Sequence, residues 1–220
     1  MNSNSSSSDR FTNALLEHAP HFNLQLSATA TTRLREYYEL VLAWNGRLHL
    51  VAPCPPEEFA ARHVLESLLA IPYMKAGAHI IDVGSGGGLP VIPCLTARTD
   101  LSATLIESAK KKTVFLREAL RVAGASERAK VIGERFEKID APPADYVTCR
   151  ALEQFTEQFQ SLVEWSPQPS ILLFFGGETL REEIEKSALS YKAVRVPESE
   201  RRFLFVVKNG SGPQKSKAEG

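Results

Sequence analysis

The stretch IIDVGSGGGLPVIP, residues 80–93, joins an apolar run with one acid to a loop that contains four glycines. The run HIIDV, residues 79–83, has the composition of a buried strand, and the glycines after it break the strand. Glycines at the end of a strand in an open α/β sheet let a ligand come close to the backbone. The stretch therefore predicts a strand, a ligand-binding loop and a helix that starts near Leu89.

Strand-like and helix-like segments alternate from residue 79 onward. We expect strands at residues 79–83, 102–107, 129–133, 145–149, 171–175, 191–196 and 202–207, with helices starting at residues 89, 108, 151 and 178. Parallel strands need crossover helices, so this alternation predicts an α/β fold with a parallel sheet covered on both faces. The last two strands are joined by a short polar loop, which predicts a C-terminal antiparallel hairpin.

The rest of the chain divides into a helical extension and two polar tails. Residues 9–75 carry helical periodicity without a strand candidate, and residues 76–208 form the α/β domain. Residues 1–8 and 209–220 are polar and low in apolar side chains, so we expect both tails to be disordered.

The composition excludes several classes of protein. Twenty-six basic residues balance 26 acidic ones, so no global positive field attracts nucleic acid or membrane. Three widely spaced cysteines without a C-x-x-C pair indicate a reducing compartment, and we expect a cytoplasmic location. No apolar stretch approaches the roughly 18 residues that cross a bilayer, and no targeting segment is evident. We expect a monomer without a membrane partner.

The spacing of the glycines discriminates between two nucleoside cofactors. A dinucleotide fold requires G-x-G-x-x-G, whereas Gly84, Gly86 and Gly88 give G-x-G-x-G around Ser85, with Leu89 at the place of the third glycine. This register favours S-adenosyl-L-methionine over NAD. A glycine-rich turn without a ligand and an NAD-dependent reductase are the alternatives.

Two acids flank the loop. Glu107 ends the second predicted strand, where a carboxylate can accept hydrogen bonds from ribose hydroxyls. Asp82 precedes the glycines by two residues and suits a cationic sulfonium better than a pyrophosphate. Both are ordinary strand-end carboxylates in the alternative interpretation.

Seven motifs together resemble one family. WNGRLHLV, ARHVLESL, IIDVGSGGGLPVIP, LIESAKKKTVFLRE, ERFEKI, CRAL and RRFLFVVK occur in the order and spacing of the RsmG family, also called glucose-inhibited division protein B, over residues 33–208. Its members methylate guanine N7 in small-subunit (16S) ribosomal RNA. The resemblance implies a Rossmann-like, seven-stranded class I methyltransferase sheet, with ribosomal RNA or the small ribosomal subunit as partner. A divergent methyltransferase for another RNA or a small molecule, and an RNA-binding assembly factor with a vestigial pocket, are the rivals.

The resemblance also implies individual cofactor contacts. They match the family's glycine loop and the segments after the second, third and fourth strands: Gly84, Leu89, Glu107, Ser108, Ala109, Phe136, Glu137 and Arg150. Core packing is the alternative for Phe136, and a solvated surface acid is the alternative for Glu137.

No catalytic side chain and no metal site are expected. Guanine N7 carries a lone pair and no proton, so methylation needs no general base, and positioning can supply most of the rate. His18 and His21 lie near the N-terminus without an acid or cysteine partner in the sequence, so we predict no metal site.

Basic residues suggest where RNA binds. The lysines at 110–112 open a helix, where the macrodipole disfavours cations and a nearby phosphate would compensate. With the family's basic positions and the best-placed histidine, the predicted RNA contacts are Arg62, His63, Lys110, Lys111, Lys112, Arg201 and Arg202. A solvated surface is the alternative, and packing is the alternative for His63. The family usually has lysine where Phe175 precedes Gly176, and this phenylalanine could instead stack on a base.

Overall fold

The computed structural model describes residues 6–150 and 155–210, and one seven-stranded sheet forms its centre. The strand order is β3-β2-β1-β4-β5-β7-β6. The strands are β1 (His79–Val83), β2 (Ser102–Ile106), β3 (Ala129–Ile132), β4 (Tyr146–Arg150), β5 (Ser170–Gly176), β6 (Tyr191–Arg195) and β7 (Phe203–Asn209). Of these strands, β7 alone runs in the direction opposite to the others. The predicted parallel sheet and C-terminal hairpin are thus confirmed.

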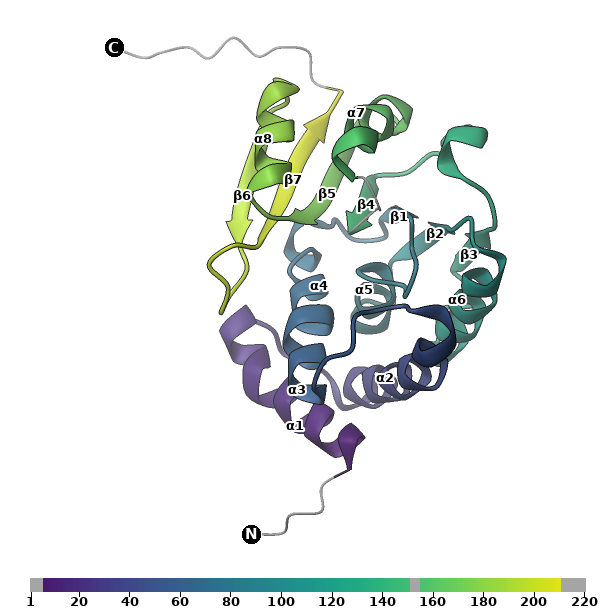
Figure 1. Cartoon of the computed structure of the whole chain (residues 1–220), viewed down its shortest axis with the longest axis vertical. Coiled ribbons are helices and arrows are strands. Elements are labelled where there is room, and N and C mark those ends of the chain that lie inside the picture. The colour runs from purple at the N-terminus through teal and green to yellow at the C-terminus, as the bar shows by residue number, and fades with distance from the viewer. Residues whose placement is uncertain (1–5, 151–154, 211–220) are drawn as a thin grey trace.

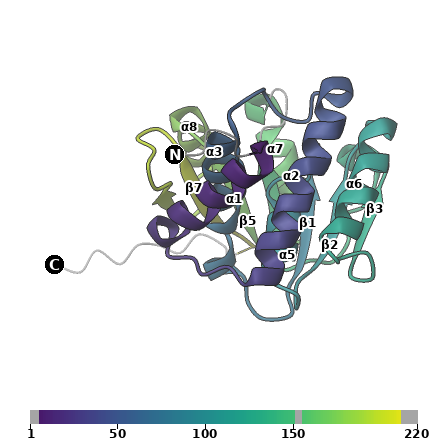
Figure 2. The ribbon, with the colours of Figure 1, turned by 90° about the horizontal axis from the view of Figure 1, so that it is seen from below.

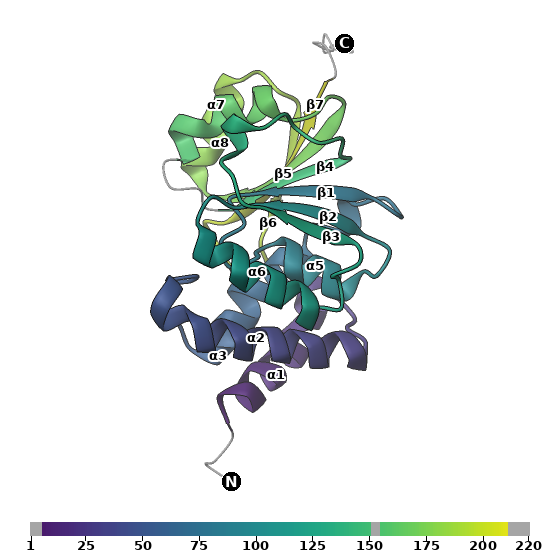
Figure 3. The same ribbon diagram turned by 90° about the vertical axis from the view of Figure 1, so that its right-hand side faces the viewer.

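Helices cover both faces of the sheet (Figure 3). The helices α7 (Phe155–Trp165) and α8 (Glu178–Lys186) lie on one face, and α5 (Val91–Ala97) and α6 (Lys110–Val122) lie on the other. Each face has its own apolar core, as expected when crossover helices pack against a parallel sheet.

The N-terminal segments form further helices on the same side of the sheet as α5 and α6 (Figures 1 and 2). They are α1 (Ser7–His18), η1 (Ala19–Phe22), α2 (Ala28–Leu48), the consecutive helical turns α3 (Pro56–Glu58), η2 (Phe59–Leu65) and α4 (Glu66–Leu68), and η3 (Ile71–Tyr73). Phe11 stacks on Tyr38 with ring centroids 4.5 Å apart. Both rings are buried in the same core cluster as Ile80 of β1, so these helices pack as part of the sheet's own core.

The inner ends of both predicted tails belong to the fold. Ser6 and Asp9 form a capping box, in which Asp9 N donates to Ser6 Oγ at 3.1 Å and Ser6 N donates to Asp9 Oδ2 at 3.2 Å. Residues 6–8 therefore cap and begin α1. Asn209 belongs to β7, pairs with Ser170 and donates to the Val163 carbonyl at 3.3 Å. Residues 1–5 and 211–220 lie outside the described part of the chain.

Helix starts on the sheet's glycine-loop side differ from the sequence-based expectation by two residues. α5 begins at Val91 rather than Leu89, and α6 begins at Lys110 rather than Ser108. The predicted start of α7 at residue 151 lies outside the described residues. Of the helices described, none combines the length and the apolar character that crossing a bilayer requires.

Candidate active site

The glycine loop follows β1 at the carboxyl edge of the parallel strands. Gly84 N and Ser85 N donate to the Ile106 carbonyl of β2 at 2.9 and 3.1 Å, which joins the loop to the neighbouring strand. Gly84, Gly86 and Gly88 all have positive φ, at 68, 51 and 83°. These are the three positions of the G-x-G-x-G register, and the loop conformation therefore requires them.

The glycines serve two different purposes. A Cβ on Gly86 would meet nothing closer than the Gly84 carbonyl oxygen at 3.7 Å, so no neighbouring atom crowds this position. A Cβ on Gly88 would lie 2.4 Å from Ile92 Cγ1, so this glycine lets α5 pack closely. Gly87 is held from the core side, because Tyr37 donates its hydroxyl to the Gly87 carbonyl at 2.5 Å. The loop is thus uncrowded at Gly86, which we call its open position, and is held against the core at Gly87 and Gly88.

Glu107 ties the end of β2 to this loop. Its Oε2 accepts from Gly86 N at 2.9 Å, and its Oε1 accepts from Ala109 N at 2.7 Å. Each carboxylate oxygen has a second lone-pair site, so Glu107 can accept two further donors without losing either bond. Paired hydroxyls on a ribose are donors of this kind.

Asp82 lies beneath the loop and is buried. Its Oδ1 accepts from Thr148 Oγ1 at 2.7 Å, while its Oδ2 has no hydrogen-bond partner among the described residues. Burial raises the pKa of Asp82 to about 7, and the hydrogen bond from Thr148 only partly offsets it. A buried acceptor without a donor is costly, so the geometry favours a ligand that brings a donor or a positive charge. The open position at Gly86, the spare acceptors on Glu107 and this carboxylate together fit a cationic nucleoside cofactor.

The other predicted cofactor residues take different positions. Leu89 is nearly buried at the end of the loop, and Ser108 and Ala109 are exposed beside Glu107. Phe136, in η4 (Phe136–Lys138), is buried and meets Trp165 edge to face at 5.4 Å. Glu137 is exposed. The packing of Phe136 accounts for its residue type without a ligand, and a cofactor contact by these residues stays a prediction.

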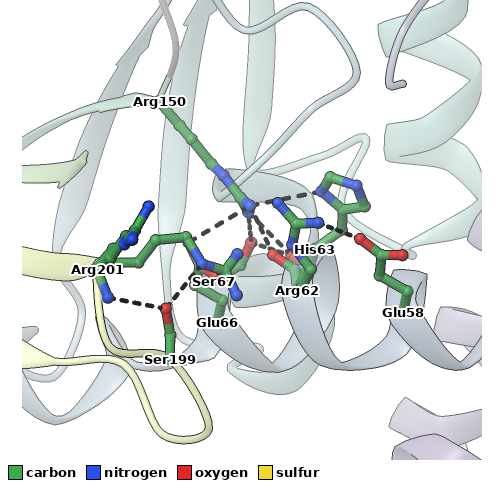
Figure 4. A network of polar contacts seen from close by, with 9 residues as sticks. Glu58, Arg62, His63, Glu66, Ser67, Arg150, Ser199 and Arg201 are labelled. Carbon is green, nitrogen blue, oxygen red and sulfur yellow. Dashed lines mark hydrogen bonds and ion pairs between the residues drawn. The ribbon is translucent and has the colours of Figure 1, made fainter. Parts of the chain in front are cut away.

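Arg150 directs its guanidinium toward the helical segment that carries Arg62, His63 and Ser67 (Figure 4). Its Nη2 donates to the Arg62 carbonyl at 2.6 Å, and its Nη1 donates to Ser67 Oγ at 3.3 Å. Glu66 Oε1 lies 3.5 Å from Nη2. Arg150 therefore fastens the end of β4 to the helical segment of residues 56–68, and a cofactor contact by Arg150 stays a prediction.

Glu66 is the centre of a network that the sequence does not reveal. It is only 3% exposed and lies between Arg150 and Arg202, whose Nη1 is 2.5 Å from Glu66 Oε2. The only sequence signal is a carboxylate within the apolar run HVLESLLA. The network joins η2 and α4 to β4 and to the loop before β7.

The predicted RNA contacts separate into two groups. Arg62 and Arg201 lie around the Glu66 network in Figure 4, and Arg202 pairs with Glu66. Ser199 Oγ accepts from Arg201 N at 3.4 Å and from Arg202 Nε at 3.3 Å. The second group, Lys110, Lys111 and Lys112, opens α6, and α5 lies between this helix and α4 in Figure 1.

His63 and Phe175 are less available than expected. Burial lowers the pKa of His63 to about 3, with the charge of Arg150 acting in the same direction, so the ring is neutral at physiological pH. It also packs on Phe59 at 5.0 Å. Phe175 is 6% exposed, and the Arg150 guanidinium lies 5.9 Å from its ring centroid. The suggestion that Phe175 stacks on a base is wrong, because the ring is buried.

The reasoning against a metal site is also corrected. No acid partner was predicted for His18 and His21, but the fold brings Glu198 from the other end of the chain to both imidazoles. The acid was missed because 177 residues separate it from His21.

Known proteins resemble this chain in sequence and in fold. The family model described as GidB, rRNA small subunit methyltransferase G, matches residues 30–206. Ribosomal RNA small subunit methyltransferase G of Gluconobacter oxydans is 35% identical over 163 residues, which cover 72% of this chain and 81% of that protein. The protein of the same name from Neisseria gonorrhoeae is 36% identical over 141 residues, covering 64% of this chain and 66% of that relative, just under two thirds of its length.

A solved structure shares the fold. The RNA methyltransferase of Salinibacter ruber in complex with S-adenosyl-L-homocysteine superimposes with a TM-score of 0.55 at 15% identity, over 77% of this chain and 100% of that one.

Proposed function

Because the chain belongs to the rRNA small subunit methyltransferase G family, we propose that it methylates small-subunit ribosomal RNA with S-adenosyl-L-methionine as methyl donor. The modified atom in this proposal is guanine N7 of 16S RNA. The observation that carries the proposal is the pair of contacts at Glu107, which fixes an acceptor-rich carboxylate against Gly86 at the open position of the loop.

The residues of the site divide the work of holding the cofactor. Glu107 accepts the ribose hydroxyls, and the loop of Gly84, Ser85, Gly86 and Gly88 presents bare backbone to the nucleoside. Asp82 supplies an acceptor or a negative charge near the cationic end. Bound S-adenosyl-L-methionine supplies an electrophilic methyl group on a positively charged sulfur.

The protein's own contribution to the chemistry is positioning and exclusion of water. Guanine N7 presents a lone pair and carries no proton, so no side chain has to remove one. Alignment of two bound reactants can lower a barrier by up to about 7–11 kcal/mol. Arg62, Arg201 and Arg202 on one side and the lysines of α6 on the other would contact RNA phosphates. With ribosomal RNA as substrate, we expect this activity in the cytoplasm.

Transfer of labelled methyl groups tests the proposal. Purified small ribosomal subunits that lack the modification are incubated with the full chain and labelled S-adenosyl-L-methionine, and the labelled base is mapped. We expect one labelled guanine at N7, with no label when Gly86→Val blocks the open position and full label with the distant Glu127→Gln control. Tight RNA binding without any methyl transfer would favour an assembly factor instead.

A further inference from the structure

Three side chains from opposite ends of the chain meet on the surface. His18 ends α1, His21 lies in η1, and Glu198 belongs to the loop between β6 and β7, which reaches down to α1 in Figure 1. Glu198 Oε1 lies 3.0 Å from His18 Nδ1 and 2.5 Å from His21 Nδ1. Both imidazoles therefore converge on one carboxylate oxygen.

The backbone on both sides holds these three residues in place. η1 is anchored by the buried side chains of Ala19 and Phe22, and the two histidine rings stand edge to face at 5.7 Å. In the opposite loop, Val196 is buried and its N–H donates to the Arg202 carbonyl at 3.0 Å. Glu198 itself has φ of 59°, which is uncommon for a residue with a side chain.

The arginines near the cluster bind groups other than the carboxylate of Glu198. Arg195 donates to the Ser199 carbonyl at 2.9 Å, and Arg202 pairs with Glu66. Among the described residues, Glu198 forms ion pairs only with His18 and His21. No lysine or arginine of the described chain therefore competes for Glu198.

Two imidazoles and one carboxylate form a ligand set that Zn²⁺ uses in proteins, with water in the fourth position. One ligand atom from each of the three residues lies within 4.8 Å of the other two. Zn–N and Zn–O bonds of about 2.0–2.1 Å place tetrahedral ligand atoms about 3.3 Å apart. The observed 3.0 and 2.5 Å separations would therefore open by less than about 1 Å to admit the ion.

We propose that His18, His21 and Glu198 bind one transition-metal ion of the Zn²⁺ class. The side chains are 29, 59 and 39% exposed, which leaves room for a water ligand and for entry of the ion. The ion clamps α1 and η1 to the loop between β6 and β7. It stabilises the fold and takes no part in methyl transfer, and its binding is independent of the proposed function.

Calorimetric titration of the metal-stripped full chain with ZnCl₂ tests this site. We expect one ion per chain and a rise in the melting temperature on binding. His21→Ala and Glu198→Gln should each raise the Kd at least tenfold and remove most of the rise in melting temperature. The matched controls His49→Asn, at an exposed histidine with the same left-handed backbone as Glu198, and Glu200→Gln, in the same loop, should bind as the wild type does.

Two results would overturn the proposal. The first is a wild-type chain that binds no Zn²⁺. The second is Zn²⁺ binding of unchanged affinity in both variants, which would assign the ion to other groups such as Cys54. Melting of the metal-free variants shows whether they fold, so a loss of binding cannot be confused with unfolding.

Discussion

Replacing Glu107 by glutamine tests whether the two carboxylate oxygens of this residue bind the cofactor. The carboxylate accepts from Gly86 N and Ala109 N, and its remaining lone pairs are the proposed acceptors for ribose hydroxyls. Glutamine has nearly the same shape, but its amide nitrogen donates instead of accepting. The substitution therefore removes acceptors from the proposed ribose site while it preserves the volume of the side chain.

Glutamine keeps one carbonyl oxygen, so one of the two proposed hydrogen bonds is lost and the other loses its charged acceptor. A hydrogen bond to a charged acceptor contributes about 1.5–3 kcal/mol and a neutral one about 0.5–1.5 kcal/mol, so the two changes together come to about 3 kcal/mol. At about 1.4 kcal/mol for each factor of ten, the Kd for the cofactor should rise about 100-fold. The amide nitrogen of glutamine would also face one of the two backbone N–H groups, donor against donor, and leave it without an acceptor. The free energy of unfolding should therefore fall by about 1–3 kcal/mol.

Calorimetric titration with S-adenosyl-L-homocysteine measures this change, and denaturant unfolding without ligand measures the stability separately. Glu127→Gln is the control, because this exposed glutamate precedes β3 at the other end of the strands. A folded Glu107→Gln protein that binds the ligand within threefold of the wild-type Kd would refute the assignment of the ribose to Glu107.

Four further substitutions test the surroundings of the site. The pKa of Asp82 in the folded chain, about 7, exceeds its ordinary value of 3.8. Between pH 4 and 7 the folded chain therefore keeps a proton that the unfolded chain has already released. The free energy of unfolding should therefore fall as pH rises through this window. Urea unfolding at pH 5 and 8 should show a fall that is a few kcal/mol larger in the wild type than in Asp82→Asn. An equal pH dependence of the two proteins would contradict this. Gly86→Ala should weaken S-adenosyl-L-homocysteine binding at least tenfold with a stability loss of about 1–2 kcal/mol. Gly88→Ala should mainly lower the melting temperature. If Gly88→Ala weakened binding more than Gly86→Ala did, the roles of the two glycines would be exchanged. Glu66→Gln should destabilise the chain by about 3 kcal/mol in urea unfolding, because it leaves Arg202 without its buried partner; a loss below 1 kcal/mol would show that water replaces the pair.

Local sequence patterns predicted most of the sheet. The strand of residues 79–83 is correct to the residue, because a β-branched run ends at a glycine that must adopt positive φ. The start of α6 was misplaced because Glu107 captures the N–H of Ala109 and delays the helix. The capping box of Ser6 and Asp9 is a local signal that the polar composition of the N-terminus obscured.

The partners of the charged residues could not be predicted from local patterns. Glu66 meets Arg202 and Glu198 meets His18 only after strands and helices far apart in the chain have packed. Arg150 was expected just after the fourth strand but is the last residue of β4, and its donors face the helical segment of residues 56–68 because three acceptors lie there. Side-chain direction at such positions depends on tertiary contacts that spacing does not encode.

The central claim is that the loop of Gly84–Gly88 and the carboxylate of Glu107 hold the nucleoside of the methyl donor. A crystal structure with S-adenosyl-L-homocysteine tests it most directly. The account predicts both ribose hydroxyls within hydrogen-bond distance of Glu107 and the nucleoside against the open side of Gly86. A ligand bound elsewhere, with Glu107 contacting only Gly86 N and Ala109 N, would contradict it.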